Sequence, residues 1–398
     1  MPRRKAIIGA VLLVLLTGLL TNRVDYLLAK HRDTRLKTGT PLPGDLARLE
    51  RVIEEIQRNY VKEVDRSTLL KGAISGMVEA LDDPYSMYMD SSHYQDLKIH
   101  TQGTFGGIGI TVGVKDKFIT VIAPIEGSPG DKAGIRSGDR ITRVNGKEIV
   151  GLPLDKAVEM IRGPEGTQVT LTILRDQDQT FEVTVTRATI EVPTVEGKLR
   201  DGGIGYIRIY TFNEKTAQRL NEVLKQLKGQ GARGIVLDLR HNPGGRLDSA
   251  IKVAEAFVPR GPIVHIVDRH GVKETYNSAS DGLGLPLVVL VDQGSASASE
   301  IVAGAIQDRR LGLLVGGKTF GKGTVQSIID LEAGTGLKLT TAQYLTPNGR
   351  AINDVGLTPD IQVERGDPQK GDDPQRDPQL EKAIEVLKGQ LNGGVSDS

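Results

Sequence analysis

The sequence predicts an α/β protein in which a smaller, β-rich domain is inserted between an N-terminal helical element and a larger β-α-β core. Three observations predict this organisation. Two runs at helical spacing come first, glycine-punctuated runs of β-type residues fill positions 96–188, and strands alternate with helical patterns over positions 189–365. A chain of 398 residues is long enough for about two to three domains.

The composition excludes several classes of function. The chain has no cysteine, which excludes disulfides, Cys-ligated zinc, iron–sulfur clusters and thiol nucleophiles. Its 51 Lys and Arg residues balance 50 Asp and Glu residues, and the net charge of +1 argues against nucleic acid as a partner. The six histidines show no metal-ligand spacing, and no phosphate-binding glycine loop is present. We therefore expect neither a metal nor a cofactor.

The first 30 residues have the pattern of a targeting segment. Basic residues at positions 3–5 precede Ala6–Leu20, an apolar run whose only polar member is Thr17. Such a run is typical of a secretory signal, and continuation through Val24–Ala29 makes it long enough to span a membrane. No small-residue cleavage site follows Leu20. We expect an uncleaved single-pass anchor with the basic end inside and the rest of the chain outside the cytoplasm, the alternative being secretion after signal cleavage.

Residues 31–95 are predicted to form a linker and a helical region. The polar linker ends near Gly44, and two amphipathic helices follow it, one centred on Leu49 and Ile53 and the other on Leu70–Leu81. Asp82-Asp83-Pro84 ends the second helix. We interpret this region as a structural part of the core without a catalytic role.

The β-rich domain, residues 96–188, is predicted to have five or six strands and one helix. Strand character is found at Phe118–Ile122, Gly138–Val144, Val169–Leu174 and Phe181–Val185, and helical spacing at Leu154–Ile161. Pro153 suits the start of that helix because its missing N–H is not needed there.

The core, residues 189–365, is predicted to contain a mainly parallel sheet. Ile235–Leu237 and Val288–Val291 are continuous apolar runs, as expected for strands covered on both faces. The candidate strands are Ile204–Ile209, Gly234–Leu239, Pro262–Val267, Pro286–Val291 and Gly312–Val315, and the candidate helices are Glu214–Leu227, Leu247–Phe257 and Ser297–Ile306. Thr324–Asp330 and Leu337–Tyr344 alternate as an antiparallel pair does.

Residues 366–398 are predicted to be a mobile connector followed by a short helix. The connector repeats Asp-Pro-Gln three times, and Leu380, Ile384, Leu387 and Leu391 lie at helical spacing. The sequence leaves open whether this helix packs on its own core or on a second subunit.

A glycine-rich segment opens the β-rich domain, Thr104-Phe-Gly-Gly-Ile-Gly-Ile110. Closely spaced glycines let backbone N–H groups converge on an anion such as a terminal carboxylate, although an ordinary turn has the same composition. The run Ser128–Ile141 and Val144-Asn-Gly follow at a suitable interval, and together these segments closely resemble a PDZ domain. The resemblance implies that Gly107, Ile108, Gly109 and Ile110 bind the carboxylate of a peptide.

Two segments of the core have residues suited to nucleophilic catalysis. Ser297 opens a predicted helix, where free N–H groups stabilise an oxyanion, although Ser297 and Glu300 also have the spacing of a helix cap. Lys322 lies between two glycines and can act as a base if burial lowers its pKa. Gln326 lies four residues further on, and we expect it to share a face with Lys322.

Ser297, Lys322, Gln326 and the loop Asp238-Leu-Arg-His-Asn-Pro-Gly-Gly245 together closely resemble the carboxyl-terminal processing peptidases, which are Ser–Lys serine proteases with a PDZ domain. The resemblance extends from Leu46 to Gly356-Leu-Thr-Pro-Asp-Ile361. It implies that Ser297 is the nucleophile, Lys322 the base and Gln326 the residue that orients the lysine. The N–H groups of Ala298 and Gly245 would form the oxyanion hole, with Gly244 as the alternative to Gly245.

The function that this resemblance implies is cleavage of extracytoplasmic proteins presented by their C-termini. A chymotrypsin-like PDZ protease is a poor alternative, because its Ser-His-Asp core would precede the PDZ domain and no Gly-Asn-Ser-Gly-Gly motif occurs. A non-catalytic PDZ scaffold is the alternative from another class, and the intact Ser297, Lys322 and Gln326 argue against it. The expected partners are peptides with free C-termini and the membrane, while an adaptor and a homo-oligomer stay open.

Overall fold

The computed structural model describes residues 43–364, except residues 177 and 272, and residues 376–393. The predicted anchor, the linker up to residue 42 and the connector over 366–375 lie outside the described residues. No helix in the described part of the chain is long and apolar enough to cross a membrane. The chain divides into two compact units, one ending at Ala80 and the other beginning at Leu81.

The first unit contains the two predicted helices, α2 (Pro43–Asn59) and α3 (Arg66–Glu79). Asp65 caps α3 by accepting the Ser67 N–H at 3.1 Å, as expected for an acidic residue at a helix N-terminus. Arg66 pairs with Glu50 at 2.7 Å and so joins the two helices.

The second unit begins with two elements that the sequence did not predict. Strand β1 (Met87–Met89) follows the Asp82–Pro84 turn, and helix α4 (Ser91–Gln102) comes next. Asp90 caps α4 through the His93 N–H, and Gly103 ends it with φ +76°. A left-handed residue at this position is the usual helix stop.

The β-rich domain confirms the predicted strands and the helix α6 (Leu154–Ile161). Its sheet is antiparallel in the order β3-β4-β5-β7-β8, with β6 paired to β5. The strands are β3 (Ile110–Lys115), β4 (Phe118–Pro124), β5 (Arg140–Val144), β6 (Lys147–Glu148), β7 (Gln168–Arg175) and β8 (Gln179–Thr186), and a short helix, α5 (Pro129–Lys132), follows β4. Ile119, Ile141 and Leu171 are fully buried between this sheet and α6.

The two chain segments that enter and leave this domain pair with each other. Strands β2 (Thr104–Gly107) and β9 (Ala188–Glu191) form an antiparallel ribbon from Thr104↔Glu191 to Gly107↔Ala188. Strand β2 of the ribbon therefore forms the first part of the glycine-rich segment and leads directly to Ile108–Ile110.

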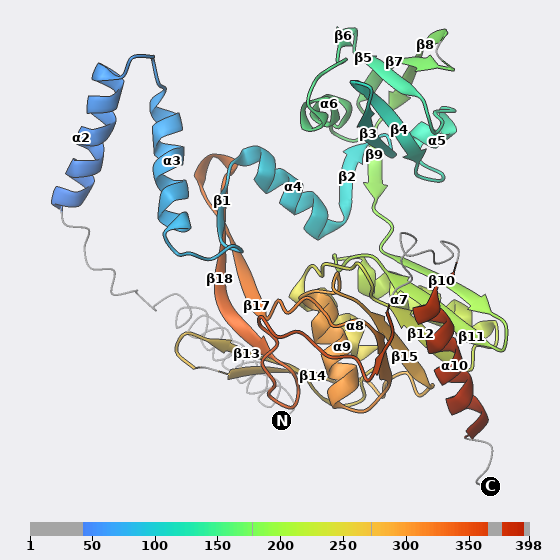
Figure 1. Cartoon of the computed structure of the whole chain (residues 1–398). Coiled ribbons are helices and arrows are strands. Elements are labelled where there is room, and N and C mark those ends of the chain that lie inside the picture. Colours follow the sequence, from blue (N-terminus) through green and yellow to red (C-terminus); the bar gives the residue numbers. More distant parts are fainter. Residues whose placement is uncertain (1–42, 177, 272, 365–375, 394–398) are drawn as a thin grey trace, which may run out of the picture. The chain divides into compact units, whose positions relative to one another are not determined.

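The core confirms the mainly parallel sheet and has three layers (Figure 1). The strand order is β10-β11-β12-β15-β16-β19, and every pair except β10–β11 is parallel. The strands are β10 (Val195–Arg200), β11 (Ile204–Ile209), β12 (Gly234–Asp238), β15 (Leu287–Val291), β16 (Leu313–Gly316) and β19 (Ile361–Gln362).

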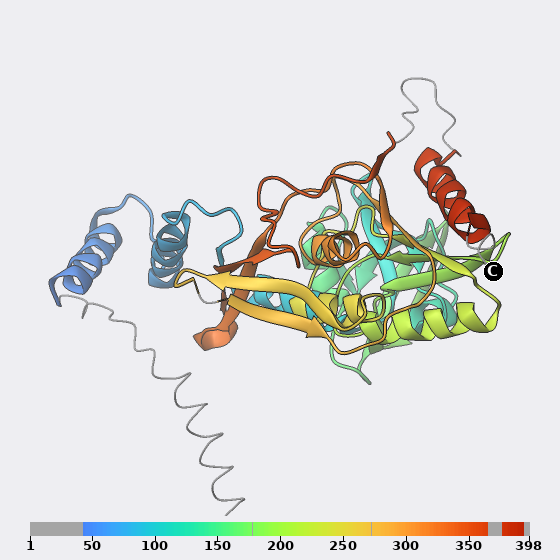
Figure 2. The same cartoon turned by 90° about the horizontal axis from the view of Figure 1, so that it is seen from below.

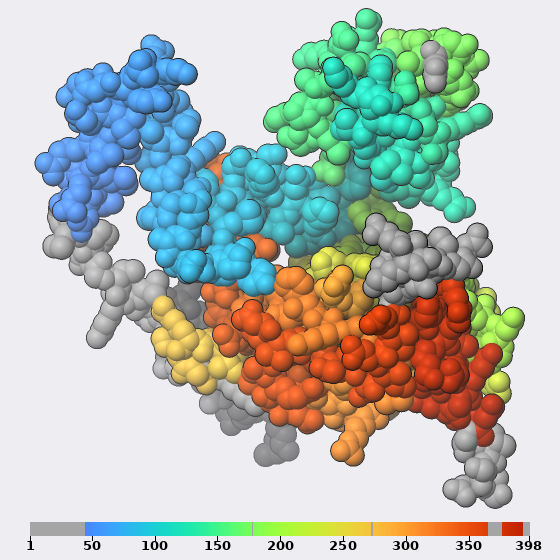
Figure 3. Space-filling view, viewed as in Figure 1, coloured from blue at the N-terminus to red at the C-terminus, as the bar shows by residue number. Residues whose placement is uncertain are grey.

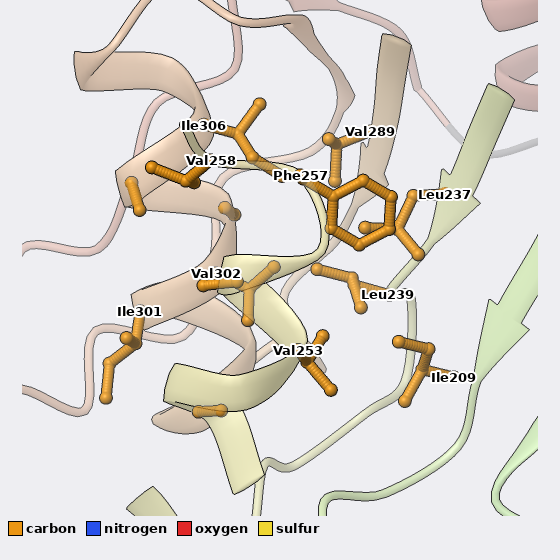
Figure 4. Close-up of a cluster of buried hydrophobic side chains, with 14 of the residues drawn as sticks. Ile209, Leu237, Leu239, Val253, Phe257, Val258, Val289, Ile301, Val302 and Ile306 are labelled. Carbon is orange, nitrogen blue, oxygen red and sulfur yellow. The ribbon is translucent and has the colours of Figure 1, made fainter. Parts of the chain in front are cut away.

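Side chains of alternate strand residues enter two hydrophobic clusters. On one face, Leu237 and Val289 pack with helices α7 (Thr216–Gly229), α8 (Leu247–Glu255) and α9 (Ala298–Asp308), and Figure 4 shows Val253, Val302 and Phe257 pointing toward these strands. On the other face, Val236 and Val288 pack with α10 (Pro378–Gly393). Figure 2 shows α7 and α10 on opposite faces of the sheet.

Helix α10 answers the question that the sequence left open. Leu380, Ala383 and Leu387 are buried against Ile204, Val236, Val288, Leu290 and Val315 of the same chain. The predicted C-terminal helix is therefore confirmed, and its partner surface is the chain's own core.

A second, antiparallel sheet lies beside the parallel one and contains β1, β13 (Gly261–Asp268), β14 (Lys273–Ser278), β17 (Thr324–Asp330) and β18 (Gly336–Leu345). The predicted β17–β18 pair is confirmed, with a 3₁₀ turn (Glu332–Gly334) between the strands. The assignment of Pro262–Val267 to the β-α-β sheet is wrong, because β13 pairs with β14 and β18. Segments that follow residue 300 form much of the core surface seen in Figure 3.

Candidate active site

Ser297 occupies the turn between β15 and α9. Its backbone has φ 54° and ψ −111°, a conformation in which a residue with a side chain is strained. Ser295 holds the preceding loop, because its hydroxyl donates to the Leu239 carbonyl at 2.8 Å and accepts the Asp292 N–H at 3.0 Å. Ser297 itself is only partly buried, so a strained and accessible hydroxyl is presented at the N-terminus of a helix.

The loop that follows β12 lies directly against Ser297. A Cβ on Gly244 would stand 2.7 Å from the Ala296 carbonyl oxygen and 3.0 Å from Ser297 Cβ, so only glycine fits there. Asn242 joins the two segments, since its backbone carbonyl accepts hydrogen bonds from the Ala296 N–H at 3.0 Å and from the Ser299 hydroxyl at 2.9 Å.

The two glycines of this loop differ in whether their N–H groups are free. The Gly244 N–H donates to Asn242 Oδ1 at 2.9 Å. Within the described residues, no hydrogen bond engages the N–H of Gly245 or of Ala298. Gly245 is also exposed, with φ +147°. Of the two glycines, Gly245 thus has the N–H available to an oxyanion.

A buried ion pair fixes the start of the same loop. The Arg240 guanidinium binds Asp238 at 2.7 Å and Asp377, just before α10, at 2.8 Å. Tyr206 donates a further hydrogen bond to Asp238 at 2.7 Å. The loop that carries Gly245 is thereby anchored to both the sheet and the C-terminal helix.

Lys322 lies just before β17, in the antiparallel sheet's part of the core. Its Nζ is 4.6 Å from the centroid of the Tyr85 ring, a cation–π contact. Burial lowers the pKa of the Lys322 ammonium, and the charge of Lys338 lowers it further, against the opposing effects of Asp83 and Glu300. No hydrogen bond between Ser297 Oγ and Lys322 Nζ occurs among the described residues.

Glu300 joins the backbones of Ser297 and Lys322. This fully buried carboxylate accepts the Ser297 N–H at 2.8 Å and the Lys322 N–H at 2.9 Å on one oxygen. Its other oxygen accepts the Thr319 hydroxyl at 2.6 Å and the Gly321 N–H at 2.8 Å. Four donors compensate the cost of burying the charge. The expected cap at Ser297 is therefore only part of the role of Glu300.

Gln326 does not share a regular strand face with Lys322. Lys322 precedes β17, and a register irregularity falls between Val325 and Gln326, so simple alternation does not relate the two residues. The Gln326 amide donates to the Thr324 hydroxyl at 2.9 Å and to the Thr340 hydroxyl at 3.2 Å. Its role toward Lys322 stays a prediction.

The segment Gly107–Ile110 borders a groove of about 250 Å³ between β3 and α6. Gly107 ends β2 and Ile110 begins β3, while Gly109 has φ +73° and a Cβ there would stand 2.3 Å from Ser128 Cβ. The groove is lined by Phe105, Gly107–Val112, Val158, Ile161 and Arg162. Its mostly apolar walls suit the side chains of an extended peptide.

Sequence reasoning missed three residues that shape this site, Asp83, Tyr85 and Tyr344, and it recognised Glu300 only as a helix cap. The segment with Asp83 and Tyr85 was interpreted only as the end of a helix, yet Tyr85 faces the Lys322 ammonium. Tyr344 was placed only in a strand, and its hydroxyl faces the carbonyls of Ser297 and Lys322. Each contact joins residues far apart in the chain, so no local pattern could reveal it.

Comparisons with known proteins agree with this geometry. Residues 203–363 match Peptidase family S41, residues 120–175 match the PDZ domain, and residues 20–93 match the activating protease CtpB N-terminal domain. A carboxy-terminal-processing protease of Bartonella bacilliformis is 43% identical over 336 residues, which are 82% of this chain and 76% of the relative. The chain belongs to the carboxy-terminal processing proteases.

A second relative supports the assignment, and a solved structure shares the fold. The carboxy-terminal processing protease CtpA of Bacillus subtilis is 39% identical over 322 residues, 80% of this chain and 69% of the relative. A solved structure from Bacteroides fragilis assigned to the S41 proteases covers 87% of this chain and 98% of its own, with 17% identity and a TM-score of 0.50, and so shares the fold. The chain is therefore a serine-type peptidase with a PDZ domain and a mixed α/β protease core.

Proposed function

We propose that this protease is an endopeptidase that cleaves by a Ser–Lys mechanism and captures protein C-termini in its PDZ domain. The observation that carries the proposal is the meeting of Ser297 and Lys322 on Glu300, which accepts the backbone N–H of each residue. A strained serine at a helix N-terminus and a half-buried lysine of lowered pKa are the two groups that nucleophilic catalysis without histidine needs.

The chemistry follows from these groups. Neutral Lys322 takes the proton of the Ser297 hydroxyl as Oγ attacks the scissile carbonyl, and the oxyanion accepts hydrogen bonds from the Gly245 and Ala298 N–H groups. Lys322 then returns the proton to the leaving amine, which leaves an ester on Ser297. Water, deprotonated by Lys322, cleaves that ester and restores both residues.

The base must move before it can act. Lys322 Nζ stands over the Tyr85 ring and not at Ser297 Oγ, so catalysis requires the side chain to turn from the ring to the hydroxyl. The proposed role of Gln326 is to hold the lysine in that second position, with Thr324 and Thr340 orienting its amide.

Capture of a C-terminus in the groove favours the active arrangement in this proposal. The terminal carboxylate binds the N–H groups of Gly107–Ile110 and the last side chain enters the apolar groove, with the peptide added as a strand. Because the β2–β9 ribbon continues into Gly107, the domain is tethered by two paired strands and moves as a hinged unit. The capture shifts its population toward the active position.

The decisive test of the proposed chemistry compares two serine variants of the full chain. Ser297→Ala is expected to abolish degradation of an unstructured protein such as casein, while Ser327→Ala, at a partly buried position in β17, keeps it. Both variants should bind a C-terminal peptide equally well. Full proteolysis by Ser297→Ala would overturn the proposal and favour another nucleophile, whereas no proteolysis by the unmodified chain would favour the non-catalytic scaffold.

A second experiment distinguishes two roles of the PDZ domain. In gating, capture of a C-terminus activates the catalytic site, whereas in passive tethering it only holds the substrate nearby. With gating, amidating the C-terminus slows cleavage of a long substrate, and a separate peptide with a free carboxylate stimulates cleavage of a short peptide that cannot bridge both sites. A passive tether only raises the local concentration of substrate, so it predicts no stimulation in trans. A flat titration with the separate peptide would rule gating out.

We further propose that residues 1–30 anchor the protease in a membrane, with the catalytic part outside the cytoplasm. The support is the basic segment before the apolar run Ala6–Leu20. The full chain should stay in the membrane fraction after an alkaline wash, and deleting residues 1–30 should release it. Full release of the unmodified chain by the wash would contradict an anchor.

A further inference from the structure

One buried tyrosine contacts both catalytic residues without belonging to the resemblance described above. Tyr344 lies on β18 and is 2% exposed, with its ring in the main hydrophobic cluster of the core. Its hydroxyl is 3.1 Å from the Ser297 carbonyl oxygen and also donates toward the Lys322 carbonyl oxygen. It thus reaches across from the antiparallel sheet to the turn that carries the nucleophile.

Tyr344 and Glu300 act on opposite sides of the same two Cα atoms. Glu300 accepts the N–H groups of Ser297 and Lys322, and the Tyr344 hydroxyl faces the two carbonyls. The direction of a side chain follows from the orientation of its Cα, which is fixed once the peptide groups on both sides are held. The strained φ of Ser297 makes such holding necessary, because an unheld residue would relax toward an ordinary conformation.

We propose that the Tyr344 hydroxyl is a positioning group that holds the peptide groups after Ser297 and Lys322, so that the lysine side chain can reach Ser297 Oγ once it turns from the Tyr85 ring. The proposal rests on the Ser–Lys function proposed above. Tyr344 touches no substrate and takes no part in proton transfer.

The surroundings keep the hydroxyl in the form that the proposal needs. Burial raises the pKa of Tyr344 well above its usual value, and the Glu300 carboxylate adds to the rise. The phenol therefore keeps its proton, and remains a hydrogen-bond donor, at every pH at which the protease works. The backbone of Tyr344 adds a further tie, since its N–H donates to the Gly323 carbonyl at 2.9 Å, one residue after Lys322.

The first test removes the hydroxyl alone. Tyr344→Phe should lower kcat roughly 10-fold or more, because small misplacements of reacting groups are costly, and leave KM for a short peptide within about 2-fold. Tyr276→Phe is the matched control, because Tyr276 packs against the same cluster from β14 without contacting either catalytic residue. An unchanged kcat in the folded Tyr344→Phe protein would overturn the proposal.

A pair of isosteres separates donation from packing. With 4-aminophenylalanine at position 344 a donor is restored, whereas 4-methylphenylalanine fills the same space without one. We expect the amino residue to restore kcat and the methyl residue to stay slow, whether or not Tyr344→Phe folds. Equal rates for the two isosteres would overturn the proposal.

Ser297→Ala in the same assay keeps the two proposals distinct. If Ser297→Ala stays active, the Ser–Lys function fails whatever Tyr344 does. If Ser297→Ala is inactive and the methyl isostere turns over like the unmodified protein, only the role of Tyr344 fails.

Discussion

The two sheets of the protease core contribute different halves of the site and are built in different ways. In the parallel sheet, β12 and β15 are buried along their whole length between α8 and α9 on one face and α10 on the other. In the antiparallel sheet, β17 ends in exposed residues, with Ile328 at 43% and Ile329 at 40% exposure. The proposed nucleophile, Ser297, follows a strand of the first sheet, and the proposed base, Lys322, precedes a strand of the second.

The two halves of the site therefore differ in how firmly the surrounding structure holds them. Ser297 and Gly245 are held by loops at the carboxyl ends of neighbouring buried strands, where a parallel sheet brings such loops together. The Lys322 side chain contacts residues that are distant in the sequence, such as Tyr85, which lies more than two hundred positions earlier in the chain. In the proposed mechanism, Ser297 and the oxyanion donors thus form a fixed frame, and Lys322 is the group that moves.

The largest expected effect comes from removing the base. Lys322→Ala and Lys322→Arg should each lower the rate of proteolysis about 10²–10⁴-fold while the fold survives. General base catalysis typically accelerates a reaction by that factor, and arginine cannot lose its proton to act as a base. Lys318→Arg, at an exposed position before the same loop, is the control and should be neutral. Lys322→Arg that keeps more than about a tenth of the activity would remove the lysine from the mechanism.

A matched pair of truncations tests the difference in rigidity. Leu290→Ala in the fully buried strand β15 should lower the free energy of unfolding of the core by about 2–5 kcal/mol. Ile329→Ala on β17 should cost under about 1 kcal/mol, because the side chain is 40% exposed. Urea unfolding of both variants measures the two values, and equal losses would show that the two side chains are packed equally well in solution.

A smaller loss is expected from Gln326→Ala. The variant should reduce kcat roughly 10-fold, about the value of one hydrogen bond, and leave binding of a C-terminal peptide unchanged. Ser327→Ala, which removes the neighbouring hydroxyl on the same strand, is the control. A fall in peptide affinity with unchanged turnover would instead place Gln326 in the substrate groove.

The smallest effect is a shift of the pH profile. Proteolysis should rise with pH as Lys322 loses its proton, and the lowered pKa puts this rise below the range of an ordinary lysine. Because the charge of Lys338 lowers that pKa, Lys338→Gln should raise it and move the rise to higher pH. Lys318→Gln, at an exposed position, should leave the profile in place. A shift to lower pH in Lys338→Gln would contradict the assignment.

The sequence predicted the parallel sheet well because a strand that is buried on both faces has a continuous apolar run, which is a local sequence pattern. The continuous apolar runs at Ile235–Leu237 and Val288–Val291 are such patterns, and both lie in strands of that sheet. The antiparallel sheet has a weaker local pattern. Strand β1 has three residues and pairs with β18 some 250 positions later, so nothing local revealed it, and β13 was given to the wrong sheet.

The residues of the candidate site also fall into those that a local sequence pattern reveals and those that only the fold reveals. Spacing and resemblance pointed to Ser297, Lys322 and Gln326, and the choice between Gly244 and Gly245 needed the Asn242 side chain, which occupies the Gly244 N–H. Glu300 could be recognised as a cap but not as the acceptor of the Lys322 N–H. Tyr85 and Tyr344 meet the catalytic residues only through the fold.

The most direct test of the central claim is the rate at which a fluorophosphonate probe phosphonylates Ser297, with loss of fluoride, measured across pH. This rate reports the nucleophile and its base without requiring peptide capture. We predict that it rises with pH through one titration in the unmodified protein, and that Lys322→Arg slows it at least about 10²-fold and removes the titration. Labelling of Lys322→Arg at an unchanged rate, with the same pH dependence, would contradict the account.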